Sequence, residues 1–103
     1  MYKIVFLSKG QVYELFAEAV ESSHLVGFVT VSKLLFDTDA GVVIDPTEER
    51  MRREFAETEQ LLLPMQSVIR IEKVKKRGAA VIRDRTSGEK VTPLPVDGPG
   101  RKR

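Results

Sequence analysis

Runs of apolar residues dominate the first part of the chain. Residues 4–7 (Ile-Val-Phe-Leu) are apolar on both faces, which is typical of a short central strand. A polar turn at Ser8-Lys9-Gly10 follows, and Gly10 can take the positive φ that hairpin turns need. Residues 11–20 then fit a long second strand, although Glu-Leu-Phe-Ala-Glu-Ala within them also favours a helix. The preceding turn leads us to expect the strand, with the helix as the open alternative.

A third strand and a helix are predicted next. Residues 25–36 are rich in Val, Phe and Thr, and Gly27 among them predicts a bulge or a sharp bend. Residues 45–48 (Asp-Pro-Thr-Glu) combine a capping residue, a proline at the first helical position and the spacing of a capping box. We expect a helix from there to about Thr58, with Met51 and Phe55 facing the body of the protein.

The stretch from Leu61 to Val74 predicts two strands around a corner. Leu61-Leu62-Leu63 has the pattern of a buried strand, which Pro64 ends because it cannot donate to a ladder. A further strand starts at residues 68–71, where three of the four residues are β-branched. Residues 79–82 are expected to add an edge strand.

The chain is expected to divide near residue 84. Residues 84–103 hold three of the five prolines and three of the seven glycines, which favours a mobile tail. We therefore predict one domain over residues 1–83 and a mobile basic tail over residues 84–103.

Several short motifs occur in a fixed order over about residues 1 to 75. They are Met1–Leu7, Gly10–Glu14, Val26-Gly27-Phe28, Val43–Pro46, Arg53-Glu54-Phe55, Pro64-Met65 and Ile69-Arg70-Ile71. Together they resemble a family of short bacterial proteins, domain of unknown function 1820. The family is similar in architecture to Sm-like proteins, whose barrels often assemble into rings and bind RNA. The resemblance implies a mainly β fold: a small, strongly bent, five-stranded antiparallel barrel, here with one short helix inserted between strands 3 and 4.

The RNA contacts of Sm-like proteins are not implied in the same way. Those contacts come from a loop with an Asp-x-x-x-Asn pattern and another with Arg-Gly or Lys-His. The corresponding places in this chain hold Asp37-Thr38-Asp39 and Pro64-Met65-Gln66-Ser67, without an asparagine or a basic residue. The resemblance therefore carries over the fold and not the RNA site.

Charge is distributed unevenly along the chain. Residues 1–72 carry seven Lys/Arg and twelve Asp/Glu, giving −5, whereas residues 73–103 carry ten and three, giving +7. An acidic body with a basic arm can recruit RNA, single-stranded DNA or an acidic partner, and a solubilising tail is the alternative. If nucleic acid binds, we expect it to contact the basic residues Arg70, Lys73, Lys75, Lys76 and Arg77.

Catalytic chemistry has little support in the sequence. The chain contains no cysteine, so it lacks a thiol nucleophile and thiolate ligands. His24 is the single histidine and lies in a polar turn with no nucleophile tied to it by a motif. Asp37 and Asp39 lack the further oxygen ligands of a calcium site. No glycine-rich phosphate loop is present. We expect no enzyme activity, cofactor or metal, and infer no small-molecule substrate.

The remaining features indicate a cytoplasmic binding module. No apolar run reaches the roughly 18 residues of a membrane span, and Met1–Ser8 lacks the pattern of a signal peptide. Six aromatic residues could stack on bases, but their positions in strands favour a place in the core. We expect a non-catalytic binding or assembly module that forms homo-oligomers through edge strands such as Leu61–Leu63, with RNA or single-stranded DNA binding through the basic arm as the alternative. The six aromatic residues are Tyr2, Phe6, Tyr13, Phe16, Phe28 and Phe36.

Overall fold

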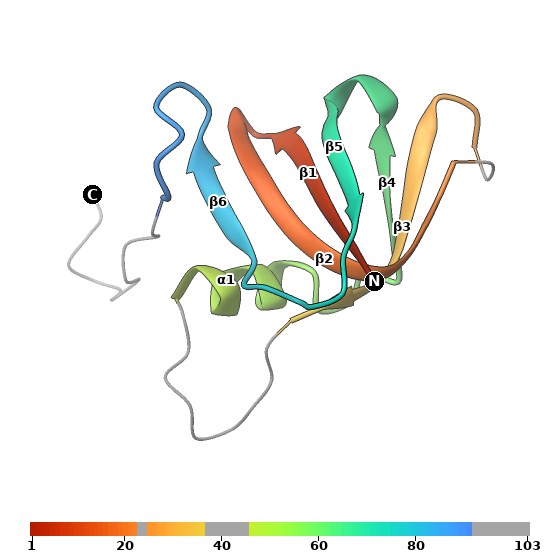
Figure 1. Ribbon diagram of the computed structural model, residues 1–103, viewed down its shortest axis with the longest axis horizontal. Coiled ribbons are helices and arrows are strands. Elements are labelled where there is room, and N and C mark those ends of the chain that lie inside the picture. Colours follow the sequence, from red (N-terminus) through yellow and green to blue (C-terminus); the bar gives the residue numbers. More distant parts are fainter. Residues whose placement is uncertain (23–24, 37–45, 92–103) are drawn as a thin grey trace.

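A computed structural model describes residues 1–22, 25–36 and 46–91, and residues 23–24, 37–45 and 92–103 lie outside this description. Within the described ranges the chain forms one antiparallel sheet, one short helix and one 3-10 turn (Figure 1). The elements in chain order are β1 (Tyr2–Ser8), β2 (Gln11–Glu21), β3 (Phe28–Leu35), α1 (Pro46–Glu54), β4 (Gln60–Pro64), the 3-10 turn η1 (Met65–Ser67), β5 (Val68–Lys73) and β6 (Val81–Asp84). The predicted order of three strands, a helix and further strands is confirmed.

The hairpin of β1 and β2 settles the open question about residues 11–20. Both residues of its turn have positive φ, 54° at Lys9 and 76° at Gly10, the geometry that matches the twist of two antiparallel strands. The register then runs from Ser8 opposite Gln11 to Tyr2 opposite Ala17. Residues 11–20 are therefore strand and not helix.

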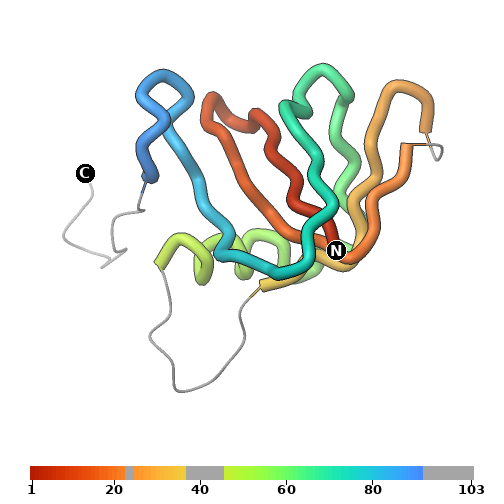
Figure 2. The backbone as a smooth tube through the Cα atoms, viewed as in Figure 1, coloured from red at the N-terminus to blue at the C-terminus, as the bar shows by residue number. Residues whose placement is uncertain are grey.

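β2 is the centre of the sheet because three strands pair with it. β1 lies along one edge of β2, and the other edge is divided between two partners. The first half of that edge, Gln11–Glu14, pairs with β6, and the second half, Phe16–Glu21, pairs with β3. The complete order is β4-β3-β2-β1-β5, with β6 attached to β2, and the tube in Figure 2 shows β6 beside the N-terminal half of β2.

The predicted five-stranded barrel is not closed. Within residues 1–22, 25–36 and 46–91, β4 pairs with β3 alone and β5 pairs with β1 alone, so the two end strands do not join. Between these two strands lie η1 and, in β5, a bulge. The β1–β5 register shifts between Val5 and Phe6 and leaves Ile69 without an opposite residue. Bulges bend a strand and interrupt its pairing. The sheet also has six strands and not five, because β6 extends it along β2.

The core lies on the concave side of the sheet, beneath α1. Met51 of α1 is fully buried there and packs with Ile4, Phe6 and Leu15. Phe55 follows one turn later and is half-buried against the same cluster, as predicted. The helix is shorter than expected. It ends at Glu54, because the next backbone bonds, such as Thr58 N–H to Phe55 O at 3.1 Å, span three residues and tighten the chain into a turn.

The bend predicted at Gly27 lies at another residue of the third strand. Gly27 does not bend the third strand from within. It lies in the turn before β3, with φ +83°, and its carbonyl accepts a hydrogen bond of 2.9 Å from Met65 N–H. The bend of β3 lies instead at Lys33, which has φ +58° and no partner in the β2–β3 register.

Contacts with the body continue beyond the predicted domain boundary at residue 84. The Asp84 carboxylate accepts hydrogen bonds from the N–H groups of Thr86 and Ser87, at 2.7 and 2.9 Å. These bonds lower the pKa of Asp84 and fix a tight turn. Val91 then donates to Ile82 O at 2.7 Å and packs against the core. The division at residues 83 and 84 stays a prediction, and residues 92–103 of the expected tail lie outside the described ranges.

Candidate interaction surface

The basic residues predicted to bind nucleic acid do not form one patch. Arg70 and Lys73 are three positions apart in β5, opposite Val5 and Tyr2 respectively. Because side chains alternate along a strand, Arg70 and Lys73 point to opposite faces of the sheet. Arg70 also donates to Glu72 at 2.6 Å on its own face, which offsets its charge.

The three basic residues that follow β5, Lys75, Lys76 and Arg77, are also directed to different places. Lys75 and Lys76 are exposed in the bend after β5. Arg77 turns back to α1, where its Nη1 lies 3.2 Å from Oε2 of Glu48. The Glu48 side chain is only 5% exposed, so Arg77 neutralises a buried carboxylate. Arg77 therefore has a structural role that its place in a basic run does not indicate.

The convex face of β1, β2 and β6 carries a row of paired charges. Glu14 forms an ion pair with Lys3 at 3.5 Å and accepts a hydrogen bond from Arg83 at 2.7 Å, so one carboxylate joins the three strands. Glu72 lies next in the row because its residue is opposite Lys3 in the β1–β5 register. With Arg70, this row holds three cations and two carboxylates, and each carboxylate lies beside at least one cation. The paired charges largely offset one another, which weakens the attraction of a charged macromolecule.

Exposed apolar side chains gather at the end of the sheet where β4 turns into β5. Met65 in η1 is 46% exposed, and Ile69 in the β5 bulge is 58% exposed. The hydrogen bond from Met65 N–H to Gly27 O brings the turn before β3 to the same place, where Val26 is 95% exposed. We call the following residues the apolar edge surface: Leu25, Val26, Met65 and Ile69.

The apolar edge surface adjoins two open strand edges. The outer edges of β4 and β5 have no strand partner in the part of the chain that the structure describes. Such an edge presents a row of N–H and C=O groups that can pair with another strand. Sequence analysis predicted an edge at Leu61–Leu63 but not the edge of β5. The alternation of Val, Ile and Glu in β5 gives no signal of exposure.

Near the turn between β1 and β2, three polar side chains lie close together, which the sequence did not predict. They are Lys9, Tyr13 and Glu54. Lys9 Nζ lies 3.1 Å from Glu54 Oε2 at the end of α1, and this contact raises the pKa of Lys9. Burial, and then the nearby Glu54 carboxylate, raise the pKa of the Tyr13 hydroxyl. Tyr13 therefore stays protonated at neutral pH, and its ring stacks on Phe6 with the centroids 5.5 Å apart.

The histidine and the two aspartates that no motif connects with catalysis or metal binding lie outside the described residues. His24, Asp37 and Asp39 are among those that the structure does not describe. Over the described ranges, no group of three or more His, Cys, Asp or Glu side chains is placed to hold a metal ion. In the same ranges no helix has the length and apolarity that crossing a bilayer requires.

Comparison with known proteins gives one match. A family model described as Domain of unknown function (DUF1820) matches residues 1–96. No curated protein and no solved structure matches the chain. The matched region ends beyond Val91, so it includes β6 and the turn that follows.

Proposed function

The chain belongs to the Domain of unknown function (DUF1820) family, and we propose that it is a non-catalytic assembly module whose copies join through their open sheet edges. The observation that carries this proposal is the pair of outer edges on β4 and β5, bordered by the apolar edge surface. A second copy could extend the ladder and bury the exposed side chains in one step. Backbone pairing of this kind supplies affinity, and the apolar residues supply the favourable burial of surface.

Pairing β4 of one copy with β5 of the next is the arrangement we propose. The two strands have five and six residues, so their lengths match. The two edges are different surfaces of one protomer, and their contact is head-to-tail. Such a contact closes into a ring or continues as a filament, according to the rotation between neighbours.

An Sm-like fold is the finer architecture that we propose for this family. Two observations support it. The strand order is β4-β3-β2-β1-β5, so its two end strands, β4 and β5, follow one another in the chain. Only the three residues of η1 connect them. A barrel requires its end strands to be neighbours, and this connection brings β4 and β5 together at one end. The open seam between them is where a second copy would add its strand.

The assembly is tested by sedimentation of the wild-type chain and of Ile69→Lys. The new lysine places a charge in the bulge of the β5 edge, which opposes pairing with a second strand. We expect the wild type to sediment as an oligomer, and Ile69→Lys to raise the dissociation constant at least about tenfold. Thr86→Lys, which adds the same charge in the exposed turn after β6, is the matched control and should assemble as the wild type does. A wild-type chain that stays monomeric at about 100 μM would contradict the proposal.

Nucleic-acid binding through the basic arm is the second candidate. Lys73, Lys75 and Lys76 are exposed, and none of them has an ion pair with another described residue. They can therefore contact phosphates without first breaking an internal contact.

Replacing all three of these lysines with glutamine should weaken binding to mixed-sequence RNA and reduce its dependence on salt. If each lysine contacts one phosphate of a single strand, the slope of log K against log salt should fall by about 2. Fluorescence anisotropy of a labelled RNA at several salt concentrations measures both quantities. Arg70→Gln is the comparison variant and should change the slope less, because Arg70 is paired with Glu72. A triple variant that binds with the wild-type slope would exclude these lysines as the contact.

A further inference from the structure

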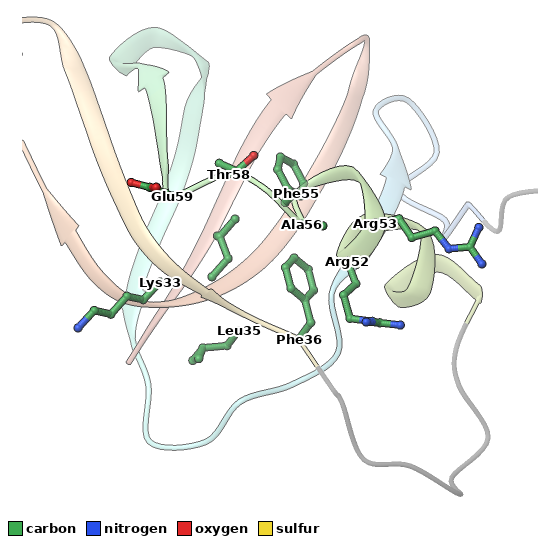
Figure 3. A pocket seen from close by; sticks show the side chains of 10 residues that line it. Lys33, Leu35, Phe36, Arg52, Arg53, Phe55, Ala56, Thr58 and Glu59 are labelled. Atoms are coloured by element: carbon green, nitrogen blue, oxygen red, sulfur yellow. The ribbon is translucent and has the colours of Figure 1, made fainter.

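A cleft of about 710 Å³ lies between the end of β3 and the end of α1 (Figure 3). Lys33 to Phe36 form one wall, and the other wall is formed by Arg52, Arg53, Phe55 and Ala56. The volume is within the range of roughly 300–1,000 Å³ that small-molecule sites occupy in proteins. The cleft adjoins the start of β4, because β3 is the neighbour of β4 and the lining residues Thr58 and Glu59 lead directly into that strand. None of the lining residues belongs to the apolar edge surface.

Two aromatic rings form the centre of this cleft. The rings of Phe36 and Phe55 are within 9° of parallel, with their centroids 6.4 Å apart. Both residues are half-buried against the core, so their positions are fixed while part of each ring remains exposed. Leu34 and Leu35 add apolar surface beside them. A planar, apolar group therefore has a preformed surface on which to stack.

Cationic side chains flank these rings. Figure 3 shows Arg52 and Arg53 on one side of Phe36 and Lys33 on the other. Three cations and one carboxylate, that of Glu59, line the cleft, so its charge is positive.

Among the described residues, the two arginines share one partner, Glu49, and keep most of their donors. Arg52 donates to Glu49 at 2.6 Å and Arg53 donates to Glu49 at 3.2 Å. The contacts with Arg52, and then with Arg53, lower the pKa of Glu49, which stays anionic and leaves this trio with one net positive charge. A guanidinium has five N–H donors, and each arginine uses one here. The remaining donors suit the oxygens of a phosphate.

We propose that this cleft binds a nucleotide, with the base against Phe36 and Phe55 and the phosphate against Arg52 and Arg53. The combination of a stacking surface with a cationic rim selects this ligand class. An aliphatic anion would leave the rings uncovered, and an uncharged aromatic molecule would leave the guanidinium donors without a partner. Lys33, at the bend of β3, lies on the other side of Phe36 with its ammonium group directed away from the rings, so the phosphate contact rests on the two arginines. The nucleotide is either free or one unit of a single strand, because both present the same base and phosphate.

Titration with adenosine monophosphate, followed by the backbone amide shifts in nitrogen–proton correlation spectra of the full chain, tests the proposal. We expect the largest shifts at residues 33–36 and 52–56. Adenosine, which lacks the phosphate, and inorganic phosphate, which lacks the base, should each bind at least about tenfold more weakly. A short oligoadenylate that binds more tightly than the mononucleotide would identify a strand as the source, and equal affinity would identify the free nucleotide. Shifts that are absent from these residues, or equal affinity for adenosine and adenosine monophosphate, would overturn the proposal.

Variants on the rim separate binding from folding. Arg53→Gln changes a side chain that is 78% exposed and should weaken binding of adenosine monophosphate about tenfold. Lys33→Asn should weaken binding less, because Lys33 lies on the other side of Phe36 from the two arginines. Asparagine is chosen here because it tolerates the positive φ of this position. Arg50→Gln is the matched control, since Arg50 is exposed on the same helix but does not line this cleft.

Phe55→Leu tests the stacking surface. Leucine keeps apolar volume against the core and removes the ring, so this variant should bind adenosine monophosphate more weakly while inorganic phosphate binds as before. Spectra that keep the wild-type dispersion show that each variant is folded. Wild-type affinity in both Arg53→Gln and Phe55→Leu would overturn the assignment of the cleft.

Discussion

Replacing Met51 with alanine is expected to lower the free energy of unfolding by about 3 kcal/mol, the largest effect of any single change considered. Met51 is fully buried, and it is the side chain by which α1 enters the core cluster. The nine residues of α1 cannot form a stable helix alone, so the helix depends on this contact. Urea denaturation followed by circular dichroism measures the change.

Two controls show whether the loss comes from the Met51 side chain. Met51→Leu keeps the volume and should cost less than about 1.5 kcal/mol. Arg50→Ala changes the preceding, exposed residue and should stay within about 0.5 kcal/mol of the wild type. A loss of less than about 1 kcal/mol in Met51→Ala would mean that α1 is not held to the sheet by this side chain.

Replacing Arg77 with methionine is expected to cost about 2 kcal/mol of stability, because it removes a cation from the buried Glu48 carboxylate. The effect should be smaller in a chain that also carries Glu48→Gln, since a neutral amide needs no counter-charge. A double-mutant cycle in urea denaturation should therefore give a coupling of about 1–2 kcal/mol. Arg70→Met is the matched control. Its pair with Glu72 is exposed at the surface, so its loss should cost less than about 1 kcal/mol.

The Arg77 result also bears on the nucleic-acid candidate. One outcome is that Arg77→Met binds RNA less well only under conditions in which the variant is partly unfolded. That result would show that Arg77 affects RNA binding through the stability of the fold and not through contact with RNA. Additive losses in the cycle would show that Arg77 and Glu48 act independently, and Arg77 would then remain a candidate for contact with a ligand.

Local sequence patterns were sufficient to locate most elements. The polar turn at Ser8–Gly10 correctly indicated a hairpin, and this decided the strand at residues 11–20 against its helical composition. Pro64 correctly indicated the end of the fourth strand, which it terminates. The proline at residue 46 correctly indicated the start of α1. Each of these signals acts within a few residues and has a direct steric or hydrogen-bonding cause.

Contacts between distant parts of the chain could not be predicted in this way. Glu48 was interpreted as part of a capping box, which stays a prediction because Asp45 lies outside the described residues. Nothing in the sequence indicates that Glu48 is also buried and bonded to Arg77, 29 residues away. Lys73 to Arg77 form one basic run in the sequence, yet strand alternation and the bend after β5 direct them to different places. The cleft between Phe36 and Phe55 depends on how α1 meets β3. No motif within either segment specifies that meeting.

The open seam could not be predicted for the same reason. Apolar alternation indicates which face of a strand is buried, but it does not indicate which strand lies beside it. The bulge at Ile69, which shifts the β1–β5 register, has no glycine to mark it. The resemblance to Sm-like proteins predicted a closed barrel, and the sheet retains two edges instead.

The division of one β2 edge between β3 and β6 has a consequence for the order of folding. Arg83 and Glu14, which are bonded across that edge, are 69 residues apart in the sequence. Local hairpins such as that of β1 and β2 can form while the chain is still emerging from the ribosome, but the partner of Gln11–Glu14 is synthesised only after β5. Until then the first half of the central strand is exposed on one side. Contacts between residues so far apart in the sequence slow folding. Until β6 is in place, this edge of the nascent chain can pair with a wrong partner. Pairing of β6 with Gln11–Glu14 is therefore the step that protects this edge of the sheet from aggregation.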